Sequence, residues 1–137
     1  IEQMKCIKYS ATHDAVNQYG GFMMDTLWEG NATNNSTIEL NESYRNYDII
    51  YICCRTVDTS NGDIFISNIP FLSRSIEVGD LLTLEVPSVA KAYLNNTARC
   101  KVNSTISMTI TDSVYINVVK VVGMKGSIPT IIEGGAL

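Results

Sequence analysis

Short apolar stretches separated by turn signals are the feature of this sequence that most narrows its possible folds. The clearest stretch is Tyr47–Arg55, which is almost continuously apolar and is followed by the pair Asn61-Gly62. A short apolar run rich in β-branched residues is typical of a strand that is covered on both faces. Asn-Gly suits the tight type I′ turn of a β-hairpin. The sequence therefore predicts strands joined by turns rather than long helices.

Similar stretches recur along most of the chain, and turn signals separate them by roughly 8–12 residues, the spacing typical of a sandwich or barrel. We therefore predict an all-β fold, an antiparallel and jelly-roll-like β-sandwich of about eight or nine strands. The expected strands cover Phe22–Glu29, Thr37–Leu40, Tyr47–Arg55, a return strand from Ile64, Leu81–Val86, Ala98–Val102, Thr105–Thr111 and Val114–Val122, with Val89–Leu94 as a strand or one helical turn.

Alternation of polar and apolar residues predicts which side chains face the core. In Leu81–Val86 the even-numbered residues share one face, and Ile106 is expected to point inward together with Met108 and Ile110. Pro70 cannot donate a backbone hydrogen bond, so its stretch is restricted to a sheet edge or a loop. The pattern thus predicts core positions as well as strands.

The two ends of the chain differ from this pattern. Residues 1–20 are irregular and end at the pair Gly20-Gly21, so we expect a short N-terminal arm or a linker from an upstream region. Residues 21–126 are expected to form one sandwich domain of ordinary size. Residues 127–137 are expected to be a C-terminal extension, such as a strand added to a neighbour.

Charge and hydropathy exclude several classes of protein. The chain has 10 Lys and Arg against 14 Asp and Glu, a net charge of −4, which argues against a nucleic-acid-binding surface. An apolar content of 45% argues against disorder. The longest uninterrupted apolar run is Ile49–Cys54, far too short to cross a membrane, and the first residues contain no signal-peptide core. We expect neither nucleic acid binding nor membrane insertion.

Four cysteines occur, at Cys6, Cys53, Cys54 and Cys100, and they allow two disulfides in three connectivities. Neighbouring strand residues point to opposite faces, so Cys53 and Cys54 cannot share a partner, and a bond between them would be strained. We interpret the cysteines as small buried hydrophobes in a reducing environment, and the disulfide alternative stays open. Without a C-x-x-C pair, a zinc site is not expected.

Catalytic and ligand-binding motifs are weak. His13-Asp14 is the only start for an acid–base dyad, but such sites depend on geometry rather than adjacency, and we interpret the pair as solvated surface. A calcium loop counted from Asp58 needs Gly at its sixth place and Glu at its twelfth, where this chain has Asp63 and Ile69. The sequence therefore predicts no catalytic residue, no metal site and no cofactor.

The aromatic residues allow two interpretations. Trp28 and the tyrosines can form a sugar-binding platform, because an aromatic face suits the C–H face of a sugar. We favour the interpretation that Trp28, Tyr47, Tyr51 and Tyr115 fill the core or an interface. Tyr44, which is flanked by polar residues, is expected to be exposed.

Four stretches carry recognisable short motifs: Thr26–Gly30 (T-L-W-E-G), Ser36–Leu40 (S-T-I-E-L), Tyr47–Tyr51 (Y-D-I-I-Y) and Tyr115–Gly123. The first three resemble successive strands in the C-terminal domains of bacteriophage tail-fibre and receptor-binding proteins, and the fourth is similar to the usual final strand of those domains. The resemblance covers about residues 21–124 in pattern, with short motifs. It implies a β-sandwich tip domain, usually trimeric, that binds the host surface and carries no catalytic residues.

We therefore expect a virion structural protein that is assembled in the bacterial cytoplasm, namely a tail-fibre or spike domain with loops for receptor binding. The implied partners are further copies in a homotrimer, other virion proteins, and a host cell-surface glycan or protein. The alternatives are a capsid decoration or other assembly protein without a host ligand, and a small hydrolase built on His13. The candidate receptor-binding residues are Tyr44, Arg45, Asn46, Asp58, Asn61, Asp63, Asn95 and Asn96.

Overall fold

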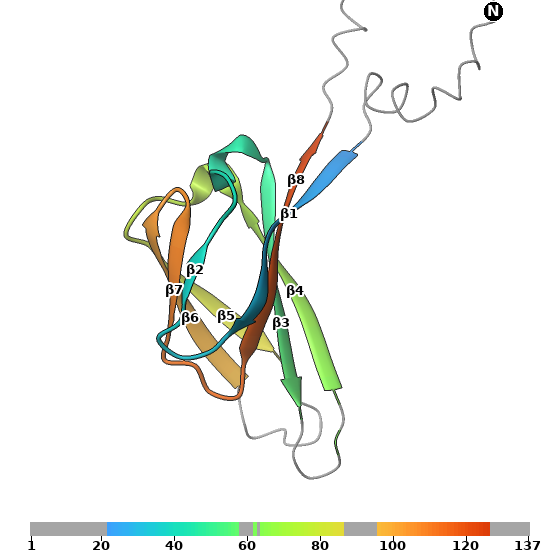
Figure 1. The fold of residues 1–137 in the computed structure, drawn as a ribbon, viewed down its shortest axis with the longest axis vertical. Helices are drawn as coiled ribbons and strands as arrows, with labels where there is room; N and C mark the ends of the chain where they lie inside the picture. Colours follow the sequence, from blue (N-terminus) through green and yellow to red (C-terminus); the bar gives the residue numbers. More distant parts are fainter. Residues whose placement is uncertain (1–21, 58–61, 63, 87–95, 127–137) are drawn as a thin grey trace, which may run out of the picture. The chain divides into compact units, whose positions relative to one another are not determined.

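The structure is a computed structural model that describes residues 22–57, 62, 64–86 and 96–126 (Figure 1). The expected N-terminal arm, the C-terminal extension and the stretch Val89–Leu94 lie outside the described residues. The elements are β1 (Phe22–Ala32), β2 (Thr37–Glu39), η1 (Tyr44–Asn46), β3 (Ile49–Val57), β4 (Ile64–Leu72), η2 (Ser73–Ser75), β5 (Leu81–Val86), β6 (Asn96–Ser104), β7 (Ser107–Thr111) and β8 (Asn117–Gly126), where η marks a 3₁₀ helix.

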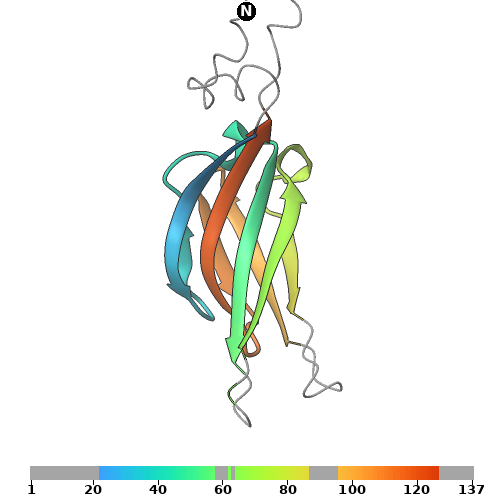
Figure 2. The ribbon, with the colours of Figure 1, turned by 90° about the vertical axis from the view of Figure 1, so that its right-hand side faces the viewer.

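The strands form two four-stranded antiparallel sheets, which confirms the predicted all-β sandwich with eight strands in the described residues. One sheet has the order β1-β8-β3-β4 and faces the viewer in Figure 2, and the other has the order β2-β7-β6-β5. In the second sheet three consecutive strands are followed in space by β2, which is a Greek-key order. The chain divides into two compact units, of which Asp25–Gly123 contains the core. The described residues of the other unit are the first three of β1 and the last three of β8.

The core is built by the alternation that the sequence predicts. In β5 the side chains of Leu82, Leu84 and Val86 are buried, while the residues between them are exposed. From the facing sheet, Ile50 and Ile52 of β3 are also fully buried. Each large aliphatic side chain that is removed from water contributes about 1.5–3 kcal/mol, so these two sheets are held together by their inner faces.

Pro70 lies in β4, which is an edge strand of its sheet, as its missing N–H requires. The partner register aligns it with Tyr51 of β3. The expectation that its stretch lies at a sheet edge or in a loop is confirmed.

One predicted core position is wrong. Ile106, expected to point inward, is 45% exposed, because it lies in the turn between β6 and β7 and not in a strand. Ser104 pairs with Ser107 across this turn, and the Ile106 N–H donates to Ser104 Oγ at 3.2 Å. The following strand therefore begins at Ser107 rather than at Thr105.

Three cysteines are described, and all three are free. Cys54 and Cys100 are fully buried, as expected for small hydrophobes, and burial raises the pKa of each thiol to about 12. Cys53 is only half-buried on the other face of β3, where burial also raises its pKa. Cys6 lies outside the described residues.

Candidate functional site

The predicted receptor-binding residues that the structure describes, Tyr44–Asn46 and Asn96, lie at opposite ends of the sandwich (Figure 1). Tyr44–Asn46 precedes the start of β3, whereas Asn96 begins β6 and pairs with Val86, the last residue of β5. A nine-residue strand such as β3 is about 30 Å long. The other predicted residues, Asp58, Asn61, Asp63 and Asn95, lie outside the described residues.

Asn96 was expected in an exposed loop, and this expectation is wrong. It is the first residue of β6, where it pairs with Val86 of β5, and its side chain is only 5% exposed. The strand continues two residues further toward this end than the expected Ala98–Val102, because pairing with β5 extends it. Asn96 is therefore part of the sheet rather than of a display loop.

Tyr44 was also expected to be exposed, and its side chain is 0% exposed. The η1 helix turns its ring into the end of the core, and its hydroxyl finds no hydrogen-bond partner in the described part of the chain. Its backbone is held on both sides, since its N–H donates to the carbonyl of Thr105 at 3.0 Å and the Ser73 hydroxyl donates to its carbonyl at 2.8 Å. Tyr44 closes the core.

Arg45 and Asn46 are exposed, as predicted, but both make contacts within the chain. The Arg45 guanidinium lies 5.4 Å from the centre of the Tyr44 ring and donates to the carbonyl of Ile76 at 3.2 Å. The Asn46 amide donates to Glu42 Oε1 at 2.9 Å. These contacts hold Arg45 and Asn46 against the end of the sandwich that contains Tyr44. The polar groups of these two side chains therefore already have partners within the chain.

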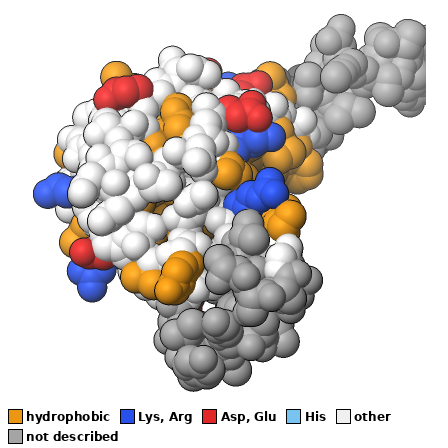
Figure 3. Space-filling view, turned by 60° about the horizontal axis from the view of Figure 1, so that its bottom comes forward, with side chains coloured by type: hydrophobic (Ala, Val, Ile, Leu, Met, Phe, Trp, Pro, Cys, Tyr) orange, Lys and Arg blue, Asp and Glu red, His pale blue; other side chains and the backbone are white. Residues whose placement is uncertain are grey.

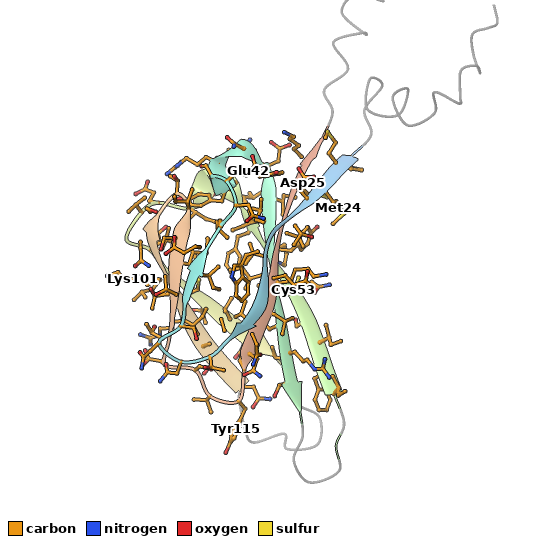
Figure 4. All side chains as sticks on the ribbon, in the orientation of Figure 1. Met24, Asp25, Glu42, Cys53, Lys101 and Tyr115 are labelled. Carbon is orange, nitrogen blue, oxygen red and sulfur yellow. The ribbon has the colours of Figure 1, made fainter. Side chains whose placement is uncertain are left out.

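Tyr47 completes the same end, and Figure 4 shows its two partners, Asp25 and Glu42, close together there. Its partly buried hydroxyl is hydrogen-bonded to Asp25 Oδ2 at 2.7 Å and to Glu42 Oε2 at 2.8 Å. Burial, and then the hydrogen bonds to these carboxylates, raise the pKa of Tyr47 above its ordinary value. A side chain at Gly123 would lie 2.5 Å from the Tyr47 ring, so glycine is required there.

The loop between β7 and β8 at the opposite end has a different character. Tyr115 is 65% exposed, and its backbone has φ +62°, a left-handed conformation that costs a residue with a bulky side chain about 1–2 kcal/mol. Figure 4 shows its side chain pointing away from the sandwich. Beneath it, Ile116 is almost fully buried and anchors the loop in the core. The surrounding structure therefore holds Tyr115 outward.

Hydrogen bonds fix this loop from both sides. The Ser113 hydroxyl donates to the carbonyl of Ile116 at 2.7 Å, and the Val114 N–H donates to the carbonyl of Thr97 at 2.8 Å. The Ser113 N–H donates to Asn34 Oδ1 of the β1–β2 turn at 3.3 Å. The two loops therefore lie side by side, and we call residues 33–36 together with 112–116 the tip.

The tip also carries exposed polar groups. Asn34 and Asn35 are exposed, and Asn35 is held at φ +70° by donating its N–H to the carbonyl of Ile110 at 2.7 Å. Asp112 lies 3.9 Å from Arg99, an exposed pair that adds little stability. Figure 3, which turns this end toward the viewer, shows charged side chains scattered among uncharged ones. A tip that presents an aromatic ring together with amide and carboxylate groups suits a polar ligand.

Sequence reasoning missed Tyr115 as an exposed side chain and placed it within an expected strand, Val114–Val122, whereas the strand β8 begins only at Asn117. The alternation carried the necessary signal: Ile116 and Val118 are both buried, so Tyr115 is out of phase with them. The other aromatic residues agree better with the core interpretation. Tyr47 is buried, and Trp28 is half-buried, with its ring over the backbone of Gly30.

Two comparisons of the sequence with known proteins bear on the identity of this chain. Neither the scan against protein-family models nor the search of the curated proteins finds a match to this chain. Within the described residues, no helix has the length and apolar character to cross a membrane, and no group of three or more His, Cys, Asp or Glu side chains could hold a metal ion. The tip and the sequence motifs are therefore the basis for a functional proposal.

Proposed function

We propose that this chain is a domain of a bacteriophage tail fibre or spike, and that its tip contacts a receptor on the host surface. The observation that carries this proposal is Tyr115, which is 65% exposed and is held in a left-handed backbone conformation at the end of a rigid sandwich. Strained backbone that the surrounding structure maintains is a feature of functional sites.

The tip has the physical properties of a binding surface. A tyrosine supplies a large apolar contact area and a hydroxyl on one side chain. Because hydrogen bonds to Asn34 and Thr97 already order the loop, a ligand does not have to order it on binding. Asn34, Asn35 and Asp112 add exposed donors and acceptors on the same two loops. A host glycan or a polar protein surface fits this chemistry.

The stretches that resemble phage receptor-binding domains lie in the sandwich itself. Thr26–Gly30 is part of β1, Ser36–Leu40 contains β2, and Tyr47–Tyr51 leads into β3. Tyr115–Gly123 contains the exposed tyrosine and most of β8. The resemblance also implies a homotrimer and contacts with other virion proteins, which we include in the proposal.

A capsid decoration or assembly protein is the second candidate, and one observation favours it. The outer face of β4 carries Ile64, Ile66 and Leu72, each at least half exposed. Contiguous exposed apolar side chains mark protein interaction surfaces. An assembly protein would use such a face against a virion partner.

Labelling of intact particles tests the proposal. Antibodies raised against the purified chain are applied to particles of the phage that encodes it and are located by electron microscopy with gold conjugates. We expect label at the distal end of the tail. Label confined to the head would contradict the tail-fibre proposal and favour the second candidate, and a lack of label on intact particles that contain the chain would contradict both surface roles.

A further inference from the structure

Two free thiols are buried in the core, one on each sheet. Cys54 of β3 and Cys100 of β6 are both 0% exposed, and neither is bonded to another cysteine. β3 is third in the strand order β1-β8-β3-β4, and β6 is third in the order β2-β7-β6-β5. The β1–β2 turn joins the two sheets at one side, and η2 joins β4 to β5 at the other side. Strands with the same place in the two orders therefore lie opposite one another, and β3 covers β6.

The two cysteines also lie at similar heights in the sandwich. β3 runs from the Tyr44 end toward the tip, whereas β6 begins near the tip and runs the other way (Figure 1). Counted from the tip, Cys54 is the fourth residue of β3 and Cys100 is the fifth residue of β6. Cys54 lies near enough to influence the titration of Cys100: burial first, and then Cys54, raise the pKa of the Cys100 thiol to about 12. The two thiols are therefore neighbours across the core.

The inner faces carry small side chains at this level. The next inward residue toward the tip is Thr56 on β3 and Ala98 on β6, and both are buried. Protein cores are close-packed, so strands with small facing side chains approach more closely than the usual spacing of about 10 Å between sheets. Some Cα atoms of β3 lie within 8 Å of Cα atoms of β5, which is paired with β6. A disulfide requires Cα atoms about 4.4–6.8 Å apart, so it would draw these strands only slightly closer.

We propose that Cys54 and Cys100 form a disulfide between the two sheets when the chain meets a small oxidising disulfide such as oxidised glutathione. The thiolate of one cysteine attacks a sulfur of the oxidant and displaces one glutathione. The second cysteine attacks the protein sulfur of this mixed disulfide and displaces the other glutathione. The two protein thiols are oxidised to one S–S bond, and the oxidant is reduced to two glutathione molecules that take up the two protons. A β-sandwich can hold such a bond, because antibody domains have a buried disulfide between their sheets.

Burial determines when this bond forms. It raises the pKa of both thiols to about 12, so thiolate is scarce near neutral pH, and glutathione cannot enter a close-packed core. The bond therefore forms while the chain folds or when the sandwich opens, and the folded core then protects it. A chain made in a reducing cytoplasm would keep both thiols until its release into oxidising surroundings. That last consequence rests on the proposed function, whereas the bond itself does not depend on receptor binding.

Two variants of the full chain, each with two cysteines left, test the pairing. The first carries Cys6→Ser and Cys53→Ala, so only the proposed pair remains. The matched control carries Cys6→Ser and Cys54→Ala, and its remaining Cys53 points to the outer face of β3. When unfolded, the two chains close loops that differ by one residue, so only the folded structure distinguishes them. Each variant is equilibrated with mixtures of reduced and oxidised glutathione, and the bond is measured by intact mass and non-reducing peptide mapping.

We expect the equilibrium constant for the bond in the first variant to be about 30- to 1,000-fold larger in native buffer than in concentrated urea, as the usual stability gain from a disulfide requires. The control should show no increase. The oxidised first variant should unfold at a urea concentration about 1 M or more above that of its reduced form.

Three results would overturn the proposal: an equilibrium constant that does not rise on folding, a control that matches the first variant, or an oxidised form that is less stable than the reduced form. The first and third comparisons are made within one variant, so they do not require the control to fold. Circular dichroism verifies the folded state of each chain in native buffer.

Discussion

Tyr44 and Tyr115 lie at opposite ends of the same sandwich and have opposite environments. Tyr44 is 0% exposed and its hydroxyl is unpaired in the described structure, whereas Tyr115 is 65% exposed on a left-handed backbone. Both belong to connections that cross from one sheet to the other. Each connection contributes one side chain that closes the core: Tyr44 at one end and Ile116 at the other. Because Ile116 closes the core at its end, the side chain of Tyr115 can face solvent.

Truncation of the two tyrosines should give the largest difference between the ends. Tyr44→Ala removes a fully buried aromatic ring, and we expect it to lower the free energy of unfolding by about 3–5 kcal/mol. Tyr115→Ala removes an exposed ring, and a change within about 0.5 kcal/mol is expected. Urea denaturation of both variants measures this. Equal losses would show that the two ends do not differ as described.

Relief of the strained backbone should have a smaller effect of opposite sign. Asparagine tolerates the left-handed region better than tyrosine does, so Tyr115→Asn should raise the free energy of unfolding by about 1 kcal/mol. The same substitution should lower binding, because the ring is lost. Thermal and urea denaturation provide the measurement, with Asn35, already left-handed, as the internal precedent. A loss of stability would mean that the tyrosine ring contributes packing.

Removal of the buried hydroxyl should also stabilise the protein. Tyr44→Phe keeps the ring and deletes the oxygen that lacks a hydrogen-bond partner, so a gain of about 1 kcal/mol is expected. The matched control is Tyr47→Phe, which deletes a hydroxyl that is bonded to Asp25 and Glu42 and should therefore destabilise. If Tyr44→Phe also destabilised, the hydroxyl would have a partner such as a buried water.

The smallest effect is confined to alkaline pH. The pKa of Tyr47 is raised in the folded protein, first by burial and then by Asp25 and Glu42. The folded state therefore holds its phenolic proton above the pH at which the unfolded chain releases it, about 10. Stability from this group is complete below that pH and falls as the pH rises above it. Denaturation of the wild type and Tyr47→Phe should show a shallower alkaline loss in the variant.

The local pattern was sufficient for much of the fold. Alternation in Leu81–Val86 predicted both the bounds and the inner face of β5, and Pro70 predicted an edge strand. The errors fall where the chain leaves a sheet. Tyr44 is flanked by polar residues and Ile106 alternates with polar ones, but the burial of each depends on where its connection crosses the open end of the core. That position is a property of the tertiary structure, which a local pattern does not contain.

The candidate site follows the same division. Arg45 and Asn46 were predicted to be exposed from their polarity, and they are. Tyr115 was assigned to the core or an interface, although its alternation with Ile116 and Val118, which are both buried, indicated an outward side chain. The left-handed backbone at Tyr115 could not be predicted in the same way. A positive φ at a residue other than glycine or asparagine has no simple signal in one sequence.

Adhesion of the purified chain to bacterial envelopes tests the central claim, that the tip is the binding end. Fluorescently labelled wild type, Tyr115→Ala and Ile106→Ala are incubated with envelope preparations from a panel of bacteria that includes the phage host. Ile106 is the matched control, because it is an exposed apolar residue in a turn at the opposite end. We expect wild type and Ile106→Ala to bind the host preparation equally and Tyr115→Ala to bind at least tenfold less. Equal binding by Tyr115→Ala, or no binding by the wild type, would contradict the account.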